Sequence, residues 1–375
     1  MAVPASTVPA RTASRTAPRP AARPTDAVAA RRIGLWLFAC AGMALAMAVI
    51  GAITRLTESG LSMVEWRPLI GALPPSSEAE WQRVFDLYRQ TPEYRLKNAG
   101  MTLDDFRTIF FWEWFHRLWG RLIGLAFALP LAVFWATGAI RRVGHVPHLG
   151  WKLAGLLVLG GLQGVMGWVM VQSGLVDRPS VSQYRLAAHL GLAFVIFALL
   201  LWVGLRVLDR PGATRTLAIP EPARAALKRH ATAALAVVGV TVAWGALVAG
   251  IDAGLAYNTW PLMAGQLVPP GALSIEPAWL NPTENTALVQ FLHRWLAIAA
   301  AGVVLALAWR MARAGGGALR GPALALAAAV CLQVALGIAT LLTVVWIPLA
   351  AAHQAGAFVL VGLLVHGLHR LSPGR

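Results

Sequence analysis

The stretch FFWEWFHRLWGRLIGLAFALPLAVFWA, residues 110–136, decides what class of protein this is. It is apolar over most of its length and long enough to cross a bilayer as a helix, which takes about 20 residues. Near its start, however, it carries Glu113, His116 and Arg117. Ionisable side chains are costly inside a membrane and usually mark a functional site. We therefore predict a membrane-spanning helix that carries chemistry.

Similar apolar runs recur along the chain. The composition is 58% hydrophobic and only 13% charged, with a mean hydropathy of +0.63, which excludes an ordinary soluble protein. Eight spans take about half of the 375 residues, and the tails and loops between them leave no room for a separate soluble domain. We predict an all-α integral membrane protein with eight transmembrane helices near 33–54, 108–138, 150–172, 186–207, 231–250, 287–309, 322–345 and 349–369.

The position of the charges argues against a nucleic-acid-binding protein, although the net charge is +16. If the N-terminus is cytoplasmic, the inner segments hold 20 Lys and Arg residues against 3 acids, and the rest of the chain holds 12 against 13. The positive-inside rule thus predicts that both termini are cytoplasmic. Residues 1–32 are rich in Arg, Pro and Ala and read as a disordered basic cytoplasmic tail; an organellar transit peptide is the alternative.

The second half of the chain repeats the first, which predicts two pseudo-symmetric four-helix bundles, 33–208 and 230–370, related as parallel repeats. Four pairs of segments match: GAITRLTESG from Gly51 with GALVAGIDAG from Gly245, EWFHRLWGR around His116 with QFLHRWLAI around His293, LQGVMG around Gln163 with LQVALG around Gln333, and RLAAHLGLAF around His189 with PLAAAHQAGAF around His353.

Two outer loops, 55–107 and 251–286, are long enough to form lids. The first contains a predicted helix from Glu78 to Arg89, because Ser77 can cap its start and acids follow in the first turn. Such a helix can lie on the membrane surface. Cys40 and Cys331 fall in apolar runs and read as packing residues rather than as a disulfide or a metal site.

Four of the nine histidines occupy the matched positions of the repeat: His116, His189, His293 and His353. Each lies four to eight residues into an even-numbered span, so all four are predicted at one depth near the outer surface. Two imidazoles on facing helices are what axial ligation of haem iron requires. We predict the pairs His116 with His189 and His293 with His353. A single buried histidine could instead hydrogen-bond a neighbouring helix, but four at matched positions favour ligation.

The residues beside the histidines distinguish the two halves. Glu113 precedes His116 by three residues on the same helix face, whereas Gln290 holds that place before His293. A carboxylate can move a proton or stabilise a positive charge developing on a substrate, so Glu113 marks the first half as reactive; a plain interfacial carboxylate is the alternative. Arg117 and Arg294, each following a histidine, can bind haem propionates or extend to interfacial water.

These motifs resemble haem A synthases of the proteobacterial and mitochondrial type. TRLTESGLSMVEWRP, FFWEWFHRLWGRLIG, LQGVMGWVMVQSGL and QFLHRWLA carry the resemblance, which covers roughly residues 33–370. It implies oxidation of the C8 methyl of haem O to a formyl group, giving haem A for terminal oxidases. It further implies that His116 and His189 hold the substrate haem, that His293 and His353 hold a haem B cofactor, and that Glu113 is the catalytic acid.

The resemblance also implies which partners the protein has and where it is located. The expected partners are haem O synthase, cytochrome oxidase assembly factors, an unidentified electron donor and the lipid bilayer, with homo-oligomers possible and no nucleic acid. The expected location is the bacterial inner membrane, with the mitochondrial inner membrane as the alternative. One departure is that other members carry a cysteine pair in outer loops, whereas both long loops here lack cysteine, so no thiol-dependent step is carried over.

Two other functions compete with this interpretation. A bis-histidine electron-transfer cytochrome would hold identical haem B groups in both halves and would not need Glu113. A transporter built from parallel repeats would be expected to place charges at the midplane or to break its helices, and the spans here read as continuous.

Overall fold

The computed structural model describes residues 24–65, 73–176, 181–209, 217, 219–314 and 316–372. Within these residues the chain is helical, and eight helices are long and apolar enough to cross a membrane, as predicted. These are α1 (Pro24–Leu56), α4 (Leu103–Ala136), α6 (Leu149–Val176), α7 (Gln183–Leu208), α8 (Glu221–Gly250), α10 (Thr286–Ala314), α11 (Gly316–Leu342) and α12 (Ile347–Leu371).

Several boundaries differ from the predicted ones. Helix α1 begins at Pro24, so the part of the expected tail from residue 24 to residue 32 is helical rather than disordered. Its charged residues face away from a core that already contains Ala29, which is buried. Helix α8 begins at Glu221, before the expected boundary at 230. Residues 1–23 and Trp66 lie outside the described residues.

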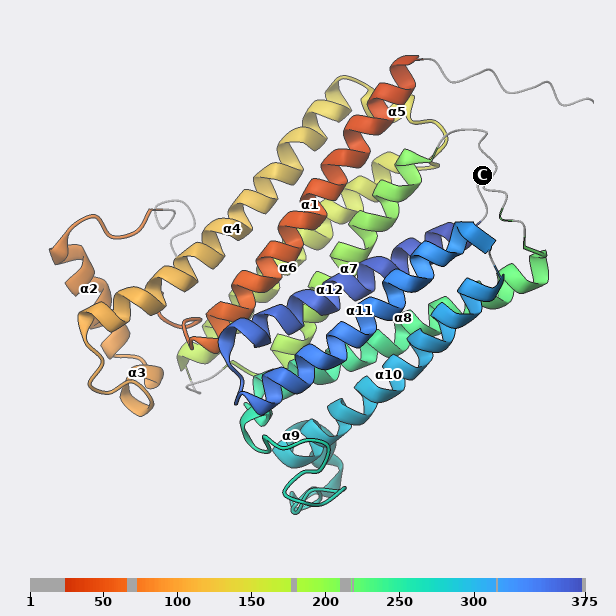
Figure 1. Ribbon diagram of the computed structural model, residues 1–375. Helices are drawn as coiled ribbons and strands as arrows, with labels where there is room; N and C mark the ends of the chain where they lie inside the picture. The colour runs from red at the N-terminus through yellow and green to blue at the C-terminus, as the bar shows by residue number, and fades with distance from the viewer. Residues whose placement is uncertain are drawn as a thin grey trace, which may run out of the picture.

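Short elements gather at the two ends of the long helices (Figure 1). Figure 1 places α2 (Glu78–Arg89), α3 (Pro92–Leu96) and α9 (Asn281–Glu284) toward one end, which we call the loop end, and α5 (Ala139–Arg142) at the opposite end. The two remaining short elements, the 3-10 turns Ala253–Leu255 and Ala278–Leu280, belong to the second long loop. The in-or-out orientation of these ends stays a prediction.

The helix predicted in the first long loop is confirmed at both ends. Helix α2 spans Glu78–Arg89, and the Ser77 hydroxyl accepts a hydrogen bond from the backbone N–H of Glu80. It packs on the start of α4 through an aromatic cluster of Phe85, Tyr88, Phe106, Ile109 and Phe110. The first loop therefore folds onto the end of α4, where burial of its aromatic face holds it.

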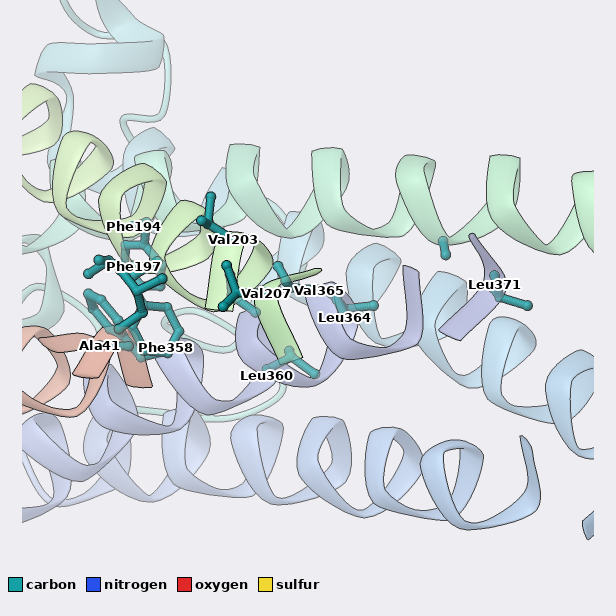
Figure 2. Close-up of a cluster of buried hydrophobic side chains, with 14 of the residues drawn as sticks. Ala41, Phe194, Phe197, Val203, Val207, Phe358, Leu360, Leu364, Val365 and Leu371 are labelled. Atoms are coloured by element: carbon teal, nitrogen blue, oxygen red, sulfur yellow. The ribbon is translucent and has the colours of Figure 1, made fainter. Parts of the chain in front are cut away.

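The two halves of the chain meet along α1, α7, α8 and α12. At the centre of this contact the rings of Phe194 and Phe358 stack with centroids 3.8 Å apart (Figure 2). Towards the loop end, Arg55 donates to the carboxylate of Asp252 at 2.9 Å. Gln354 also donates to the carbonyl of Ala48 at 2.6 Å. Apolar packing and cross-half polar contacts thus join the two groups of four long helices side by side.

The two cysteines differ in their surroundings. Cys40 is buried on α1, as expected of a packing residue, whereas Cys331 is exposed on α11. Because α11 presents an exposed apolar face, which in a membrane faces lipid, Cys331 does not fill a core position. The packing interpretation is therefore wrong for Cys331.

Candidate functional site

Each of the four matched histidines lies against a glycine of a neighbouring helix. A β-carbon added to the glycine would come within 2.9–3.3 Å of the imidazole Cε1 atom in every case. Contacts this short mean that a side chain on the glycine would push the imidazole out of its position, so the glycine allows the ring to lie there. The pairs are Gly51 of α1 with His116 of α4, Gly167 of α6 with His189 of α7, Gly245 of α8 with His293 of α10, and Gly337 of α11 with His353 of α12.

Within each half two of the matched histidines lie near each other, His116 near His189 and His293 near His353. Their pairing as haem ligands stays a prediction. Each half of the chain thus contributes one histidine pair. Among the described residues, no group of three or more His, Cys, Asp or Glu side chains could hold a metal ion. Two imidazoles can act as axial ligands of haem iron, which needs only two protein ligands.

The imidazoles have nitrogen atoms that the protein does not use. The Nδ1 atoms of His116, His189 and His293 are buried and, within the described part of the chain, have no hydrogen-bond partner. A buried nitrogen without a partner costs about 1–3 kcal/mol. Rings with spare donor atoms in a glycine-lined space fit the binding of a flat macrocycle through its metal.

A glutamine supports one histidine in each half. The Gln163 amide lies 3.2 Å from the His189 Nε2 atom and donates to the His189 backbone carbonyl at 3.1 Å. The Gln333 amide lies 3.2 Å from the His353 Nδ1 atom and donates to the His353 carbonyl at 2.9 Å. The repeat had matched these glutamines, but no role had been predicted for them. They fix the position of a histidine, as groups beside metal ligands do.

Glu113 lies buried at the loop end of α4 and accepts hydrogen bonds from three groups. Its Oε2 atom accepts from the Ser62 hydroxyl at 2.7 Å and from the Met63 backbone N–H at 2.6 Å. Its Oε1 atom accepts from the guanidinium of Arg117 at 2.5 Å. This pocket offers donors only, so it selects a carboxylate. Neither Ser62 nor Met63 had been predicted as a site residue.

The equivalent position in the second half differs at one of its two polar atoms. The Gln290 Oε1 atom accepts from Arg294 at 3.1 Å, as Glu113 accepts from Arg117, but the Gln290 nitrogen faces acceptors. The Gln290 amide donates to the backbone carbonyls of Ala253 at 2.8 Å and Tyr257 at 3.2 Å. Gln290 is buried like Glu113. A carboxylate at this position would face two carbonyl oxygens, which it cannot satisfy. The difference between Glu113 and Gln290 is therefore built into the loops that surround them.

The two arginines bind inside the protein. Arg117 bonds Glu113 and the Met63 carbonyl. Arg294 is only 9% exposed and donates to the carbonyls of Thr259 and Tyr257, each at 2.8 Å. Extension into interfacial water is therefore wrong for Arg294, which ties α10 to the second long loop.

A second buried acid lies in the first loop. Glu93 of α3 is 4% exposed and accepts a hydrogen bond from the Tyr88 hydroxyl at 3.3 Å, and that hydroxyl accepts one from the Asn98 amide at 2.6 Å. Burial, reinforced by the nearby charge of Glu113, raises the pKa of Glu93 from 4.5 to about 8. No sequence pattern had singled this residue out, because an isolated Glu in a polar loop is usually exposed.

Glu93 is expected to make the folding of the first loop pH-dependent. The folded loop holds this carboxyl protonated, whereas the unfolded loop ionises it above about pH 4.5. Stability is therefore full below pH 4.5, falls as the pH rises towards about 8, and levels off above it. Hydrogen exchange of residues 78–100 should speed up by about ten-fold or more between pH 6 and pH 9, beyond the intrinsic chemical rate. Glu93→Gln should remove this excess, and an unchanged excess would contradict the assignment.

The glycine contacts predict a matched pair of substitutions on α6. Gly167→Ala places a β-carbon 3.3 Å from His189, so the ring must move by a few tenths of an ångström. Gly164→Ala meets nothing within 4 Å and gains helix propensity of about 1 kcal/mol. We expect Gly167→Ala to shift the absorption spectrum of haem bound in that half and Gly164→Ala to leave it unchanged. Equal spectra for the two variants would show that the glycine does not position the ring.

Comparison with known proteins identifies relatives along nearly the whole chain. The family model described as cytochrome oxidase assembly protein matches residues 34–365. A protein of Rhodospirillum centenum named haem A synthase is 59% identical over 94% of this chain and 92% of its own length. Proteins of the same name from Parvibaculum lavamentivorans and Nitrosospira multiformis are 50% and 49% identical, over 91% and 88% of this chain and 94% and 90% of their own lengths.

Proposed function

The chain belongs to the cytochrome oxidase assembly family, and we propose from this that it is a haem A synthase, an enzyme that oxidises the C8 methyl group of haem O to the formyl group of haem A. The observation that carries the proposal is the pair of two-histidine sites of which only one has a buried carboxylate beside it. The competing interpretation as an electron-transfer cytochrome is not favoured, because the relatives are named as synthases.

The two histidine pairs have different tasks in this proposal. His116 and His189 hold the substrate haem O in the first half, because Glu113 lies three residues from His116. His293 and His353 hold a haem B cofactor in the second half, where Gln290 replaces the acid. The bound haem B supplies one-electron chemistry. The protein's own contribution is to hold both groups and to exchange protons at Glu113.

Glu113 is the residue proposed to act on the reacting methyl carbon. Oxidation of a methyl to a formyl group replaces two of its hydrogens by one oxygen and removes four electrons from the carbon, and a carboxylate can accept protons released in that conversion. The Ser62 hydroxyl and the Met63 N–H hold Oε2, while Arg117 holds Oε1. The carboxylate is thus fixed in orientation, which preorganises it for proton transfer or for stabilising positive charge at the substrate.

The arginines are proposed to bind haem propionates in addition to their protein contacts. Arg117 and Arg294 follow the ligating histidines directly, and the Nε of Arg294 is buried without a hydrogen-bond partner among the described residues. A guanidinium fork matches a carboxylate. Each arginine would then connect a propionate to the loop that covers its half.

The protein is a multi-pass membrane protein, and its relatives come from bacteria. We place it in the bacterial inner membrane with both termini in the cytoplasm, since the inner segments carry the positive charge. A cytochrome oxidase assembly role connects it with components of that process. The proposed partners are a haem O synthase that supplies the substrate and a membrane electron donor.

The first test is an inventory of bound haems. The full chain is purified from its native membrane, and the extracted haems are separated by chromatography and identified by mass spectrometry. We expect haem B together with haem O, haem A or a hydroxylated intermediate. Haem B alone would instead support the electron-transfer cytochrome. A preparation that never contains haem would contradict the histidine pairs themselves.

A further inference from the structure

An open surface pocket of about 470 Å³, which we call the cavity, lies away from the histidine pairs, between α8 and α10. Its lining is two arginines, a histidine and two alanines: Arg229, His230, Arg310, Ala226 and Ala233. None of its lining residues is acidic. The cavity therefore combines positive charge with a floor of small apolar side chains, and the haem chemistry makes no use of it.

Hydrogen bonds fix the charge of the cavity. The Nε2 atom of His230 donates to the Val303 carbonyl at 3.1 Å, so this nitrogen carries the proton. The Nδ1 atom then accepts from the Arg310 guanidinium at 2.9 Å, which requires a neutral ring. His230 thus holds Arg310 in place without adding charge. Arg229 is exposed and, among the described residues, forms no ion pair, so two full positive charges face the cavity.

The cavity lies at the level of a membrane interface. Arg310 is four residues from the end of α10 and follows Trp309, which is 57% exposed. Exposed tryptophans near the ends of spans lie at headgroup depth. The same end of the molecule carries the excess of Lys and Arg, and the cytoplasmic leaflet, where the positive-inside rule places it, is the one that attracts basic groups.

An exposed apolar strip continues from the cavity toward the membrane interior. Ala226, Ala233 and Val240 are spaced seven residues apart, so they share one face of α8. On α10, Gly302 and Ala306 precede Arg310 at four-residue intervals and are exposed. Small residues on both helices leave room for a chain to lie between them. Charge at the interface and exposed small apolar residues below it match a phospholipid.

We propose that this cavity binds the headgroup phosphate of an acidic phospholipid, with the two arginines on the phosphate and an acyl chain along α8 and α10. Guanidinium groups bind phosphate through paired hydrogen bonds, and basic pockets between membrane helices recognise acidic headgroups. The site lies in the half that is proposed to hold haem B, but the inference does not depend on the enzyme's activity.

The test measures lipid retained by the full chain. The protein is reconstituted in nanodiscs of equal phosphatidylglycerol and phosphatidylcholine, released into the gas phase, and its lipid adducts are counted by native mass spectrometry. We expect at least about ten-fold more phosphatidylglycerol than phosphatidylcholine adduct. Each arginine is expected to raise phosphatidylglycerol binding about five-fold. The variant with both Arg229→Gln and Arg310→Gln should therefore retain about 30-fold less phosphatidylglycerol.

Lys228→Gln is the matched control, because it removes one charge from the neighbouring exposed position, which does not line the cavity. It should retain lipid within about two-fold of the original protein. Arg229→Lys keeps the charge but not the paired N–H donors of the guanidinium, so it should lose less bound phosphatidylglycerol than Arg229→Gln. Equal losses in Lys228→Gln and Arg229→Gln would overturn the site, as would equal binding of the two lipids.

A separate arm distinguishes a lipid from a free anion. Inorganic phosphate is added to the detergent-purified protein, and thermal stability is compared with and without phosphatidylglycerol. We expect phosphatidylglycerol, and not phosphate alone, to raise the melting temperature, with the increase lost in the double arginine variant. Stabilisation by phosphate alone, with none from phosphatidylglycerol, would contradict a lipid site.

Discussion

Glu113→Gln is expected to lower the conversion of haem O to haem A by at least about 100-fold, which is the smaller end of the contribution of a general acid or base. An amide cannot take up a proton, and its NH₂ group would face a donor, because Ser62, Met63 and Arg117 all donate to this position. Product is measured by chromatography of extracted haems, in membranes supplied with haem O. The haem B content should stay within about two-fold, since Glu113 lies in the other half.

Ser62→Ala keeps the carboxylate of Glu113 but removes one of the groups that hold it in place. It removes one hydrogen bond to a charged group, worth about 1.5–3 kcal/mol, and keeps the carboxylate. We expect a smaller loss of activity than in Glu113→Gln, because the carboxylate remains and loses only one of the three groups that orient it. Glu113→Gln with full product formation and retained haem would refute the catalytic role.

His293→Ala is expected to remove haem B from the second half and to abolish product formation. An axial ligand provides the bond to iron, and loss even of a residue that only supports a ligand costs about 10–100-fold in metal affinity. We therefore expect haem B per purified chain to fall by about ten-fold or more. His116→Ala should instead lose the substrate haem and keep haem B. Haem extraction together with the optical spectrum of the reduced protein measures both.

His148→Asn is the control for these variants. His148 is exposed, lies away from both histidine pairs, and has a backbone φ of 56°, a conformation that asparagine tolerates. It should leave both haems and the activity unchanged. If His116→Ala lost haem B and His293→Ala kept it, the assignment of substrate and cofactor to the two halves would be reversed.

Much of the fold follows from local sequence. Eight apolar runs predict eight spans because a bilayer sets the length of a helix that crosses it, and each run became a helix. Helix α2 was predicted from Glu78 to Arg89 because Ser77 supplies a local cap. The end of the expected tail was wrong, since Arg31 and Arg32 continue α1. Charge does not end a helix, so this boundary had no local signal.

The repeat revealed the candidate site because residues at matched positions occupy equivalent places in the two halves. His116 and His293 matched, and so did Gly51 and Gly245, although their contact became visible only in the structure. A glycine on one helix and a histidine on another can be paired only when the packing of the helices is known. The same holds for Glu93, which is buried by a loop that the sequence shows only as polar.

The sequence by itself determined the number of spans, the repeat, the four histidines and the acid that one half has and the other lacks. These features depend on composition and on spacing along the chain. The thickness of the bilayer sets the length of each span, and the rise per residue of a helix sets the depth of each side chain. Only the tertiary structure decided that Glu113 faces three donors and Gln290 two carbonyls. Those partners come from loops distant in sequence, and the free energy of a buried polar group depends on which partners surround it.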